Sequence, residues 1–580
     1  MKNKTLRRTK ELAKPHRKTI IITSLLSLLI GIIEIVKPYL LEIAIDEYIG
    51  KGIFQKGAMT VSILGAIYIG IVLLENIIDF ITTTTVNMMG EEIIYTLRNK
   101  LFKFSQNSNI SFHDHTPAGK LFVRIINDVE DISILFKDVI ATILKDILLI
   151  FAIAGIMLYF NYKLGMLSFT IVPFIILLSA VLTSILHKQY DISKVIRTNL
   201  NTFLAESIYG AKVIKVFNIQ REKQEECEKF TEDFCKARVK TGIIEAILPG
   251  TMTVLENIGI AIIIGASTNH IWGITLEVGF VYAFVTYMRQ LFEPITRIIE
   301  NVEIVQEAFV SIDKIYDILD QKEVLEDFES GKELTEMKGR IEFKNVWFAY
   351  EEENWILKDV SFVIEPGESI ALVGKTGSGK TTITNLINRF YDIQKGEILI
   401  DGINIKDINL RCLRSSIGTI LQDPFIFAKS IKDNIKLFKN IADEDVQEAI
   451  EMASAGEFIN SLTDGVDEIA IERGNSFSEG QKQLIAFARV FANNPNIFIL
   501  DEATANIDTY TEGLIQKSID KLSKNKTAIF IAHRLSTIVN VDKIIVLSEG
   551  KIIEQGNHNT LVNSGGYYSK LYNSYYESLG

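Results

Sequence analysis

The sequence predicts a chain of two domains, an α-helical membrane domain of six helices followed by an α/β domain. The first observation behind this prediction is the distribution of apolar residues. Hydrophobic residues make up 48% of the chain, which is high beside 23% charged residues, and the excess lies almost entirely before residue 320. Near residue 340 the pattern changes to short apolar runs that alternate with turns and amphipathic stretches. We expect a membrane domain over 1–320, a linker over 321–339 and an α/β domain over 340–580.

The membrane domain is predicted from six mostly apolar windows, each long enough to span a bilayer, which takes about 20 residues. The windows cover 19–45, 57–82, 135–160, 164–187, 243–266 and 273–299. Long polar helical stretches rich in lysine and arginine separate windows two and three, and windows four and five. The positive-inside rule places these stretches, the basic N-terminus and the α/β domain in the cytoplasm of a multi-pass protein of the cell membrane. No small-residue cleavage site follows the first window, so we interpret it as a retained helix and not as a signal peptide.

Several acidic residues fall within or at the ends of these windows. They are Glu34, Glu42, Asp46, Glu75, Asp79, Glu245 and Glu256. Glu75 and Asp79 are four residues apart and therefore share a helix face. Charge inside a membrane is costly, and two interpretations stay open: a polar translocation path that tolerates cationic cargo, or pairing between helices and positions near the interface.

Charge and cysteine content exclude some classes of protein. The net charge of −11 gives no sign of nucleic-acid binding. The three cysteines, Cys227, Cys235 and Cys412, have no metal-ligand spacing and no evident disulfide role, which fits thiols in a reducing compartment.

A phosphate-binding loop opens the α/β domain. The pattern G-x-x-x-x-G-K-T runs from Gly374 to Thr381, after an apolar run that predicts a strand and before an amphipathic run that predicts a helix. Glycines let backbone N–H groups turn toward phosphates, and the helix N-terminus favours their negative charge. We expect Lys380 to reach the β- and γ-phosphates of a nucleotide triphosphate and the Thr381 hydroxyl to contact Mg²⁺.

A second motif, Ile497-Phe498-Ile499-Leu500-Asp501-Glu502, predicts a buried parallel strand that ends in two carboxylates. Ligands of open α/β sheets bind at this end of the strands. Asp501 would hold Mg²⁺, and Glu502 would polarise the attacking water as a general base. Tyr350, which lies 24 residues before Gly374, could stack on adenine or simply pack.

Further segments carry a resemblance to the ATP-binding cassette (ABC) family, specifically to its exporter-type (type IV) half-transporters. Ser476-Phe477-Ser478-Glu479-Gly480-Gln481 is similar to the family signature L-S-G-G-Q, Gln422 to its Q-loop, and His533 to its switch histidine. Ala505-Asn506-Ile507-Asp508 is similar to the D-loop, and Glu472-Arg473-Gly474 to the exporter X-loop. The segments 112–128 and 206–217 also resemble exporter sequences, so the resemblance covers essentially the whole chain. It implies a nucleotide-binding domain with a helical subdomain that carries the signature.

The resemblance implies a set of roles and the cofactors ATP and Mg²⁺. Tyr350 stacks on adenine, Glu502, His533 and Gln422 are catalytic, and Thr381, Gln422 and Asp501 arrange the metal. The remaining nucleotide-binding residues are Gly374, Lys375, Thr376, Gly377, Ser378, Gly379, Lys380, Thr381, Thr382, Ser478, Gly480 and Gln481. The family's cassettes pair head to tail, so one chain is a half-transporter that needs a second subunit.

Glu479 departs from the family pattern, because it stands where the signature has glycine. A carboxylate near a triphosphate is repulsive unless it points away. Together with the intact Glu502 and His533, this mixture resembles the subunit of a heterodimeric exporter that keeps the catalytic acid. A homodimer in which Glu479 is harmless is the alternative.

The sequence therefore predicts ATP-driven export of a hydrophobic or amphipathic substrate. An ATP-gated channel or regulatory membrane ATPase on the same frame is the alternative, and six membrane windows argue against a soluble cassette ATPase for nucleic acid. Only 18 residues precede the first helix, which leaves no room for an N-terminal peptidase domain. Drugs, lipids and peptides all stay open as cargo.

Overall fold

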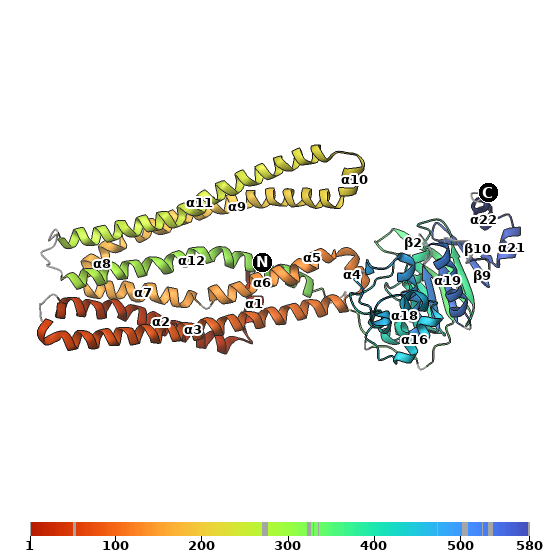
Figure 1. Ribbon diagram of the computed structural model, residues 1–580, viewed down its shortest axis with the longest axis horizontal. Helices are drawn as coiled ribbons and strands as arrows, with labels where there is room; N and C mark the ends of the chain where they lie inside the picture. Colours follow the sequence, from red (N-terminus) through yellow and green to blue (C-terminus); the bar gives the residue numbers. More distant parts are fainter. Residues whose placement is uncertain are drawn as a thin grey trace. The chain divides into compact units, whose positions relative to one another are not determined.

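The computed structural model describes residues 2–49, 54–140, 142–268, 277–321, 326–328, 330–334, 336–471, 474–501, 508–524, 526–531 and 538–577. Its contacts divide the chain into two compact units. One unit comprises residues 1–106 and 118–322, and the other comprises 107–117 and 323–580. Figure 1 shows the first unit as long helices and the second as strands covered by helices. The α/β unit therefore includes a short segment, 107–117, from within the helical half of the sequence.

The helical unit consists of long helices joined by short helical turns. Its helices are α1 (Lys2–Ala13), α2 (Arg17–Ile43), α3 (Phe54–Asn107), α5 (Ala118–Val123), α6 (Val129–Ile134), α7 (Ile143–Phe160), α8 (Tyr162–Phe169), α9 (Val172–Tyr209), α10 (Ala211–Val216), α11 (Gln220–Thr268) and α12 (Val278–Leu319). Short π-helical segments occupy Ala44–Ile49, Arg124–Asp128 and Leu135–Ile140. The polar helical stretches predicted after windows two and four begin as continuations of α3 and α9, which each extend from the apolar window into the polar sequence.

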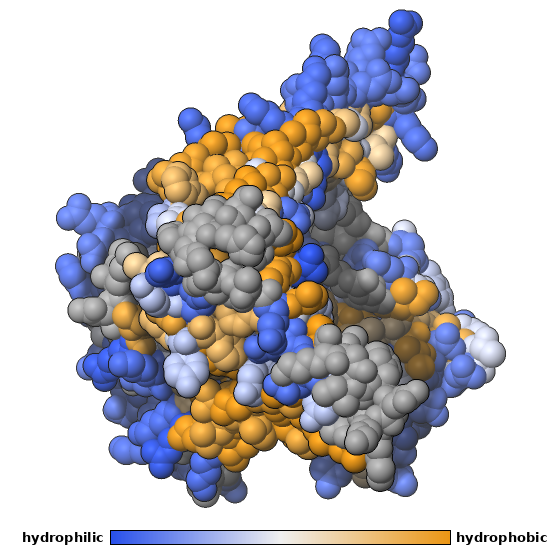
Figure 2. All heavy atoms as spheres, turned by 90° about the vertical axis from the view of Figure 1, so that its left-hand side faces the viewer, coloured by the Kyte–Doolittle hydropathy of each residue, from blue (hydrophilic) through white to orange (hydrophobic). Residues whose placement is uncertain are grey.

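Five segments among the described residues are long and apolar enough to cross a membrane. They are Arg17–Tyr48, Ser62–Asn107, Ala118–Phe160, Tyr162–Tyr209 and Gln220–Ala266. Four of them contain the first, third, fourth and fifth predicted windows in full, and Ser62–Asn107 contains the second window from residue 62 on. The sixth window coincides, from Val278 on, with α12, which is less apolar because it carries Arg289, Glu293 and Arg297. Hydrophobic side chains cover much of the outside of these helices, as the orange areas of Figure 2 show.

Ion pairs between helices hold three of the seven membrane acids, Glu34, Glu75 and Glu256. Lys37 on α2 contacts Glu75 on α3 with 2.7 Å between Nζ and Oε2, and Lys145 on α7 contacts Glu34 on α2 at 2.9 Å. The Asp46 carboxylate accepts hydrogen bonds from the first backbone N–H groups of α12. Pairing between helices, one of the two interpretations left open above, therefore accounts for Glu34 and Glu75.

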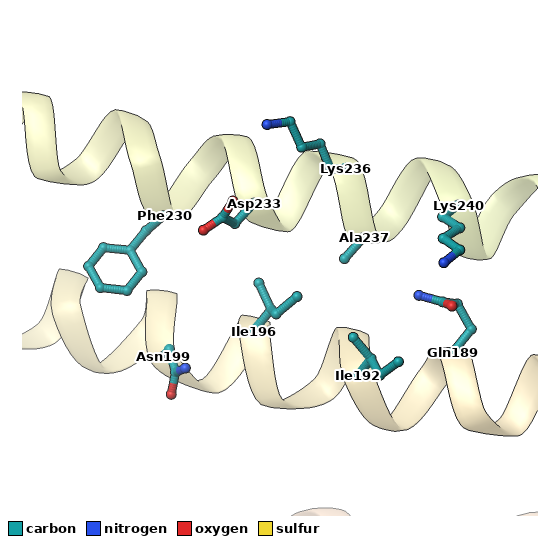
Figure 3. A pocket seen from close by; sticks show the side chains of 9 residues that line it. All are labelled: Gln189, Ile192, Ile196, Asn199, Phe230, Asp233, Lys236, Ala237 and Lys240. Atoms are coloured by element: carbon teal, nitrogen blue, oxygen red, sulfur yellow. The ribbon is translucent and has the colours of Figure 1, made fainter.

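The helices α9 and α11 form a long antiparallel arm with α10 at its tip (Figure 1). Figure 3 shows part of the space between them, a cavity of about 340 Å³, where Ile192 and Ile196 of α9 point toward α11 and Ala237 points toward α9. Phe203 of α9 stacks on Phe230 of α11 with ring centroids 5.0 Å apart. The arm is thus held together mainly by its own two helices.

The second unit is an α/β domain with two sheets. Its strands are β1 (Ile341–Ala349), β2 (Trp355–Ile364), β3 (Ser369–Val373), β4 (Lys395–Ile400), β5 (Ile403–Asn404), β6 (Ile417–Ile420), β7 (Ile497–Asp501), β8 (Thr527–Ile531), β9 (Lys543–Ser548) and β10 (Lys551–Gly556). An antiparallel sheet has the order β2-β1-β4-β5, and a second sheet has the order β10-β9-β3-β8-β7-β6. In the second sheet all neighbours pair in parallel except β10 and β9.

The helices of this unit cover both faces of the parallel sheet. They are α4 (Ile110–His115), α13 (Lys380–Ile387), α14 (Leu410–Ser416), α15 (Ile431–Lys436), α16 (Asp443–Met452), α17 (Gly456–Asn460), α18 (Glu479–Asn493), α19 (Thr509–Leu522), α21 (His558–Asn563) and α22 (Tyr567–Glu577). Within β7, Ile497 and Ile499 face a core shared with the antiparallel sheet and α13, whereas Phe498 and Leu500 face a core shared with α18. Burial on both faces is the reason that the parallel strands are continuous apolar runs.

Candidate nucleotide-binding site

The phosphate loop connects β3 to α13, as the sequence predicts. Gly377 and Gly379 have φ angles of 81° and 105°, values that favour glycine. Gly374 has no room for a side chain, because a Cβ there would lie 2.6 Å from Ser378 Oγ and would collide with the carbonyl oxygen of Leu547. The loop is therefore a close-packed backbone turn that ends at the N-terminus of α13, where N–H groups favour an anion.

Two buried side chains of the loop are arranged to receive a ligand. Lys380 is 5% exposed, and its ammonium group donates to the carbonyl oxygens of Gly374 and Lys375 at 2.8 and 3.1 Å. Ser378 Oγ is buried and has no hydrogen-bond partner in the part of the chain that the structure describes. A buried hydroxyl without a partner is costly, and a phosphate oxygen would satisfy it. Lys375, Thr376 and the Thr381 hydroxyl lie at the exposed side of the loop.

Tyr350 follows β1 and lies beside α13. Its hydroxyl is 3.3 Å from Thr382 Oγ1, and Asn385 donates to that hydroxyl at 3.4 Å. The ring is 42% exposed, and the ring of Tyr391 contacts it edge to face with centroids 5.0 Å apart. Stacking of this ring on adenine stays a prediction.

The carboxyl ends of the parallel strands bring the other site residues to the same edge. Asp501 at the end of β7 is in register with Ile531 of β8, and Ile531 is in register with Leu372, just before the phosphate loop. Gln422 lies two residues beyond β6, whose last residue pairs with Leu500. Glu502 and His533 lie outside the described residues; in the sequence Glu502 is the first residue after β7 and His533 the second after β8. Of the D-loop and X-loop segments, only Asp508 and Gly474 are described.

Gln483 and Arg489 of α18 hold the segment around Gln422 by its backbone. Gln483 is buried and donates from Nε2 to the carbonyl oxygens of Leu421 and Gln422 at 3.2 and 2.8 Å. Arg489 donates to the carbonyl oxygens of Phe425 and Asn434 at 2.7 and 2.8 Å, and burial lowers the pKa of its guanidinium to about 10. The signature helix and the Q-loop segment are therefore linked within one chain.

The signature segment forms the N-terminus of α18. Ser478 is the N-cap: its Oγ accepts from the Gln481 N–H at 3.2 Å, and Gln481 Oε1 accepts from the Ser478 N–H at 2.9 Å. This capping box fixes both residues in place. Glu479, in the first turn, forms an ion pair with Lys482 at 2.8 Å. Its carboxylate is therefore partly neutralised by its own helix.

Sequence reasoning missed Lys482, Gln483, Arg489 and Tyr391 as contributors to the site. For Lys482 a signal was available, since residues three apart on a helix are neighbours. Gln483 was also visible as a polar residue on the apolar face of an amphipathic helix. Tyr391 gave no signal, because its contacts come from residues distant in sequence.

The oxygen donors present suit magnesium. Thr381, Asp501 and Gln422 offer hydroxyl, carboxylate and amide oxygens, the ligand type that Mg²⁺ prefers. Among the described residues no group of three or more His, Cys, Asp or Glu side chains could hold a metal ion. Magnesium in nucleotide sites takes one or two protein carboxylates together with phosphates and water. The residues therefore fit a nucleotide-bound Mg²⁺.

Comparison with known proteins identifies the class of the chain. Residues 20–295 match the family "ABC transporter transmembrane region", and residues 357–505 match the family "ABC transporter". The chain belongs to the ABC transporter family, and it unites one membrane region with one ATP-binding region, the composition of a half-transporter. Its fold and domain types confirm the α-helical membrane domain followed by an α/β cassette.

Individual relatives extend over nearly the whole chain. A Streptococcus pneumoniae ABC transporter ATP-binding protein, exp8, is 34% identical over 98% of this chain and 96% of the relative. A Staphylococcus aureus protein named as a multidrug export ATP-binding/permease protein is 34% identical over 98% of this chain and 99% of its own length. A solved bacterial Atm1-family ABC exporter with ATP bound has a TM-score of 0.78 and 25% identity, covering 96% of this chain and 98% of its own. The chain is thus a multi-pass ABC exporter that couples ATP hydrolysis to transport.

Proposed function

We propose that the loop 374–381 with Tyr350 and Thr382 binds the nucleotide, that Thr381, Asp501 and Gln422 arrange its Mg²⁺, and that Glu502 and His533 complete the catalytic group. The single observation that carries this proposal is the close-packed loop with the buried Lys380 and the partnerless hydroxyl of Ser378. Both groups are suited to oxygens of a triphosphate. Bound magnesium supplies charge neutralisation for phosphoryl transfer.

Each residue then has a distinct task. Lys380 leaves the carbonyl oxygens that it now contacts and donates to phosphate. Glu502, which directly follows the Mg²⁺ ligand Asp501 in the sequence, accepts a proton from the attacking water. His533, which follows the adjacent strand β8 in the sequence, is the second member of this catalytic group. The chain supplies these groups from neighbouring parallel strands, so the relative positions of Asp501 and the loop are fixed by the sheet.

We propose that the working unit is a dimer in a cell membrane, with the ATP-binding domain in the cytoplasm. Support comes from the tip of the arm. None of the residues of α10, all of which are described, is buried. Tyr209, Val216 and Phe217 at this tip are 91%, 73% and 70% exposed. Large apolar side chains gathered at one exposed end favour contact with another subunit.

A heterodimer is the favoured form of that dimer. Glu479 adds a negative charge in the first turn of the helix that faces the partner's nucleotide in this family. The partner would carry an unaltered signature, and the ATP site between that signature and Glu502 of this chain would be the competent one. In such a pair one ATP site turns over quickly and the other slowly.

A homodimer is the second candidate, and one observation favours it. The ion pair between Glu479 and Lys482 reduces the net charge that the first turn of α18 presents. If this pair persists beside a triphosphate, the signature of this chain could serve a second copy of itself. The substrate under either form is a hydrophobic or amphipathic compound, in line with the multidrug-export names of relatives.

The test is the mass and ATPase activity of the chain purified in a lipid nanodisc, with Glu502→Gln as the inactive variant. Glu448→Gln, an exposed acid on α16, is the matched control. A dimer whose turnover is lost in Glu502→Gln and kept in Glu448→Gln establishes the homodimer. An inert chain that gains activity with a co-purified second subunit establishes the heterodimer. Turnover that survives Glu502→Gln contradicts the proposed catalytic role.

A further inference from the structure

Asp79 on α3 is a membrane-domain carboxylate to which the described part of the chain offers no hydrogen bond or ion pair. It is exposed on the isolated protomer. Glu75, one helical turn earlier, is by contrast largely buried against Lys37 of α2. The two acids therefore have different surroundings although they are only four residues apart.

The packing of α3 on α2 places Asp79 near the middle of the membrane domain. Its neighbour Ile78 forms a buried cluster with Ile30 and Ile33 of α2. Since α2 extends over Arg17–Ile43, Ile30 is about 20 Å along the helix from its basic first residue and about 20 Å from its last, at 1.5 Å per residue. A charge at this depth is costly in contact with lipid.

Two further contacts fix the same register between the helices. His16, just before α2, lies 3.5 Å from Glu92 of α3, and Lys37 contacts Glu75 farther along. Asp79 falls between these two levels. The sequence windows alone had put it near the cytoplasmic end of the second membrane helix, so the mid-membrane position is new information from the structure.

Asp79 belongs to a polar stripe on α3 with Asn76, Thr83 and Asn87. All four side chains are exposed. Their spacing of three, four and four residues places them on one face of the helix. The Asn76 amide donates only to the carbonyl oxygen of Val72 in its own helix, at 2.7 Å. Polar faces of membrane helices face a bundle interior or a water-filled cavity, so we expect this stripe to line such a space.

No positive charge of the described membrane windows is left over to neutralise Asp79. Every lysine and arginine in these windows already has an acidic partner. The pairs are Lys37 with Glu75, Lys137 with Glu91, Lys145 with Glu34, Arg289 with Glu256, and Arg297 with Asp146. A second copy of this chain would bring the same paired set. A cation that meets Asp79 would therefore come from a molecule other than this chain, either a different second subunit or a cationic substrate.

We propose that Asp79 recognises the positive charge of a cationic amphipathic substrate, with Asn76 and Thr83 as hydrogen-bonding neighbours. Phe80, 71% exposed on the same side of α3, would contact the apolar or aromatic part of that substrate. This inference rests on the proposed transport function and names its substrate class. Charge complementarity favours this occupant over lipid and over an identical subunit.

Binding of ethidium, a permanent aromatic cation, tests the proposal without any need for ATP turnover. Its affinity is measured by fluorescence anisotropy for the full transporter in lipid nanodiscs, assembled with its second subunit where the dimer needs one. Nile red serves as an uncharged probe. Asp79→Asn is expected to weaken ethidium binding at least tenfold and to leave Nile red binding within twofold, whereas Asp79→Glu keeps both within threefold. Asp138→Asn, another exposed acid of the membrane domain, is the matched control and should change neither.

Three results would overturn the inference. The first is ethidium binding by Asp79→Asn that equals that of the wild type, and the second is loss of both probes together with the dimer, which would make the stripe a subunit interface. The third is a wild type that hydrolyses ATP normally and binds Nile red but not ethidium. That last result contradicts the inference about Asp79 and leaves the proposed transport function intact. Absence of ATPase activity in every assembly would instead contradict the proposed function, and the binding measurement would be unaffected by it.

Discussion

Gly374 illustrates how tightly single residues of the phosphate loop are determined. Its missing side chain leaves room for the Leu547 carbonyl oxygen from the neighbouring strand β9 and for the Ser378 hydroxyl. The neighbours are partly backbone, which cannot rotate away as a flexible side chain can. The close contact of Gly374 with β9 therefore also determines the shape of the phosphate loop.

Gly374→Ala is expected to lower ATP affinity at least tenfold, because the new Cβ displaces the turn that aims Lys380 and Ser378. The cost in stability should be about 1–3 kcal/mol, as for other overpacked sites. Fluorescent-nucleotide binding and thermal unfolding of the full chain measure both effects. The control is Gly513→Ala on α19, where a Cβ meets nothing within 4 Å. Unchanged nucleotide affinity in Gly374→Ala would contradict this account of the loop.

Helix α4 is the element whose role is clearest only in three dimensions. It lies in the sequence between α3 and α5 of the helical unit, but its contacts assign it to the nucleotide-binding unit. The hydroxyl of Tyr391 donates to the carboxylate of Asp114 on α4, and the Tyr391 ring contacts that of Tyr350. A contact path therefore joins α4 to the aromatic residue beside the phosphate loop.

Tyr391→Phe is expected to loosen α4, because one charge-assisted hydrogen bond is lost, at a cost of about 1–3 kcal/mol. Hydrogen exchange of residues 110–115 measures the loosening, and Tyr510→Phe, which removes a comparable bond to Glu457, should leave α4 unchanged. Burial raises the pKa of the Tyr391 hydroxyl. The contact is fully present below the ordinary tyrosine pKa and is lost only as pH rises through the higher folded value, so its effect should be constant from pH 6 to about 9. Equal hydrogen exchange of residues 110–115 in the wild type and in Tyr391→Phe would show that Tyr391 does not hold α4.

Helix α1 is fastened to the end of α12, just before the linker. Arg8 is buried between Asp313 and Asp320, with nitrogen–oxygen distances of 2.9 and 2.7 Å, and its guanidinium lies over the ring of Tyr316. The hydrogen bond from Arg8 holds the pKa of Asp320 below its usual range. This stabilisation is present above the ordinary aspartate pKa and is lost as pH falls through the lower folded value, so α1 should stay docked from about pH 5 upward.

Arg8→Ala is expected to release α1, with a loss of about 1–3 kcal/mol for a partly exposed pair of acids left without its cation. Faster hydrogen exchange over residues 2–13 and faster proteolysis at the N-terminus would be the signs. Arg7→Ala, whose side chain pairs with Glu11 on the exposed side of α1, is the matched control. If Arg8→Ala and Arg7→Ala show the same hydrogen exchange and proteolysis, Arg8 does not hold α1 on α12.

These elements show what local sequence can and cannot predict. The order strand, glycine loop, helix around Lys380 was predictable, because each part has its own periodicity or glycine signal. The capping role of Ser478 was likewise within reach of the S-x-x-Q pattern. The assignment of α4 to the nucleotide-binding unit and the depth of Asp79 depend on contacts between distant segments, such as Tyr391 with Asp114 or Ile78 with Ile30. The continuation of α3 and α9 beyond the apolar sequence agrees with the polar helical stretches that were predicted after windows two and four.

At the scale of the whole molecule, the arm formed by α9 and α11 is the part that a single protomer leaves incomplete. Its tip carries Tyr209, Val216 and Phe217 with most of their surface exposed. Such side chains stabilise a soluble end of a protein only when another surface covers them. The arm is therefore expected to reach a second subunit and to make the coupling between the subunits depend on these few residues.

The double substitution Tyr209→Ser with Phe217→Ser is expected to reduce stimulation of ATP hydrolysis by transported substrate at least fivefold, because the apolar contact that couples the arm to the partner is lost. The membrane helices still associate, so the mass of the dimer should not change. Hydrogen exchange over residues 208–217 should be slower in the wild-type dimer than in the double variant. Val239→Ser removes an exposed apolar side chain from the arm away from its tip and is the matched control. Equal exchange at the tip in monomer and dimer would show that α10 stays in solvent, and the coupling of the two halves would then have to pass through other helices.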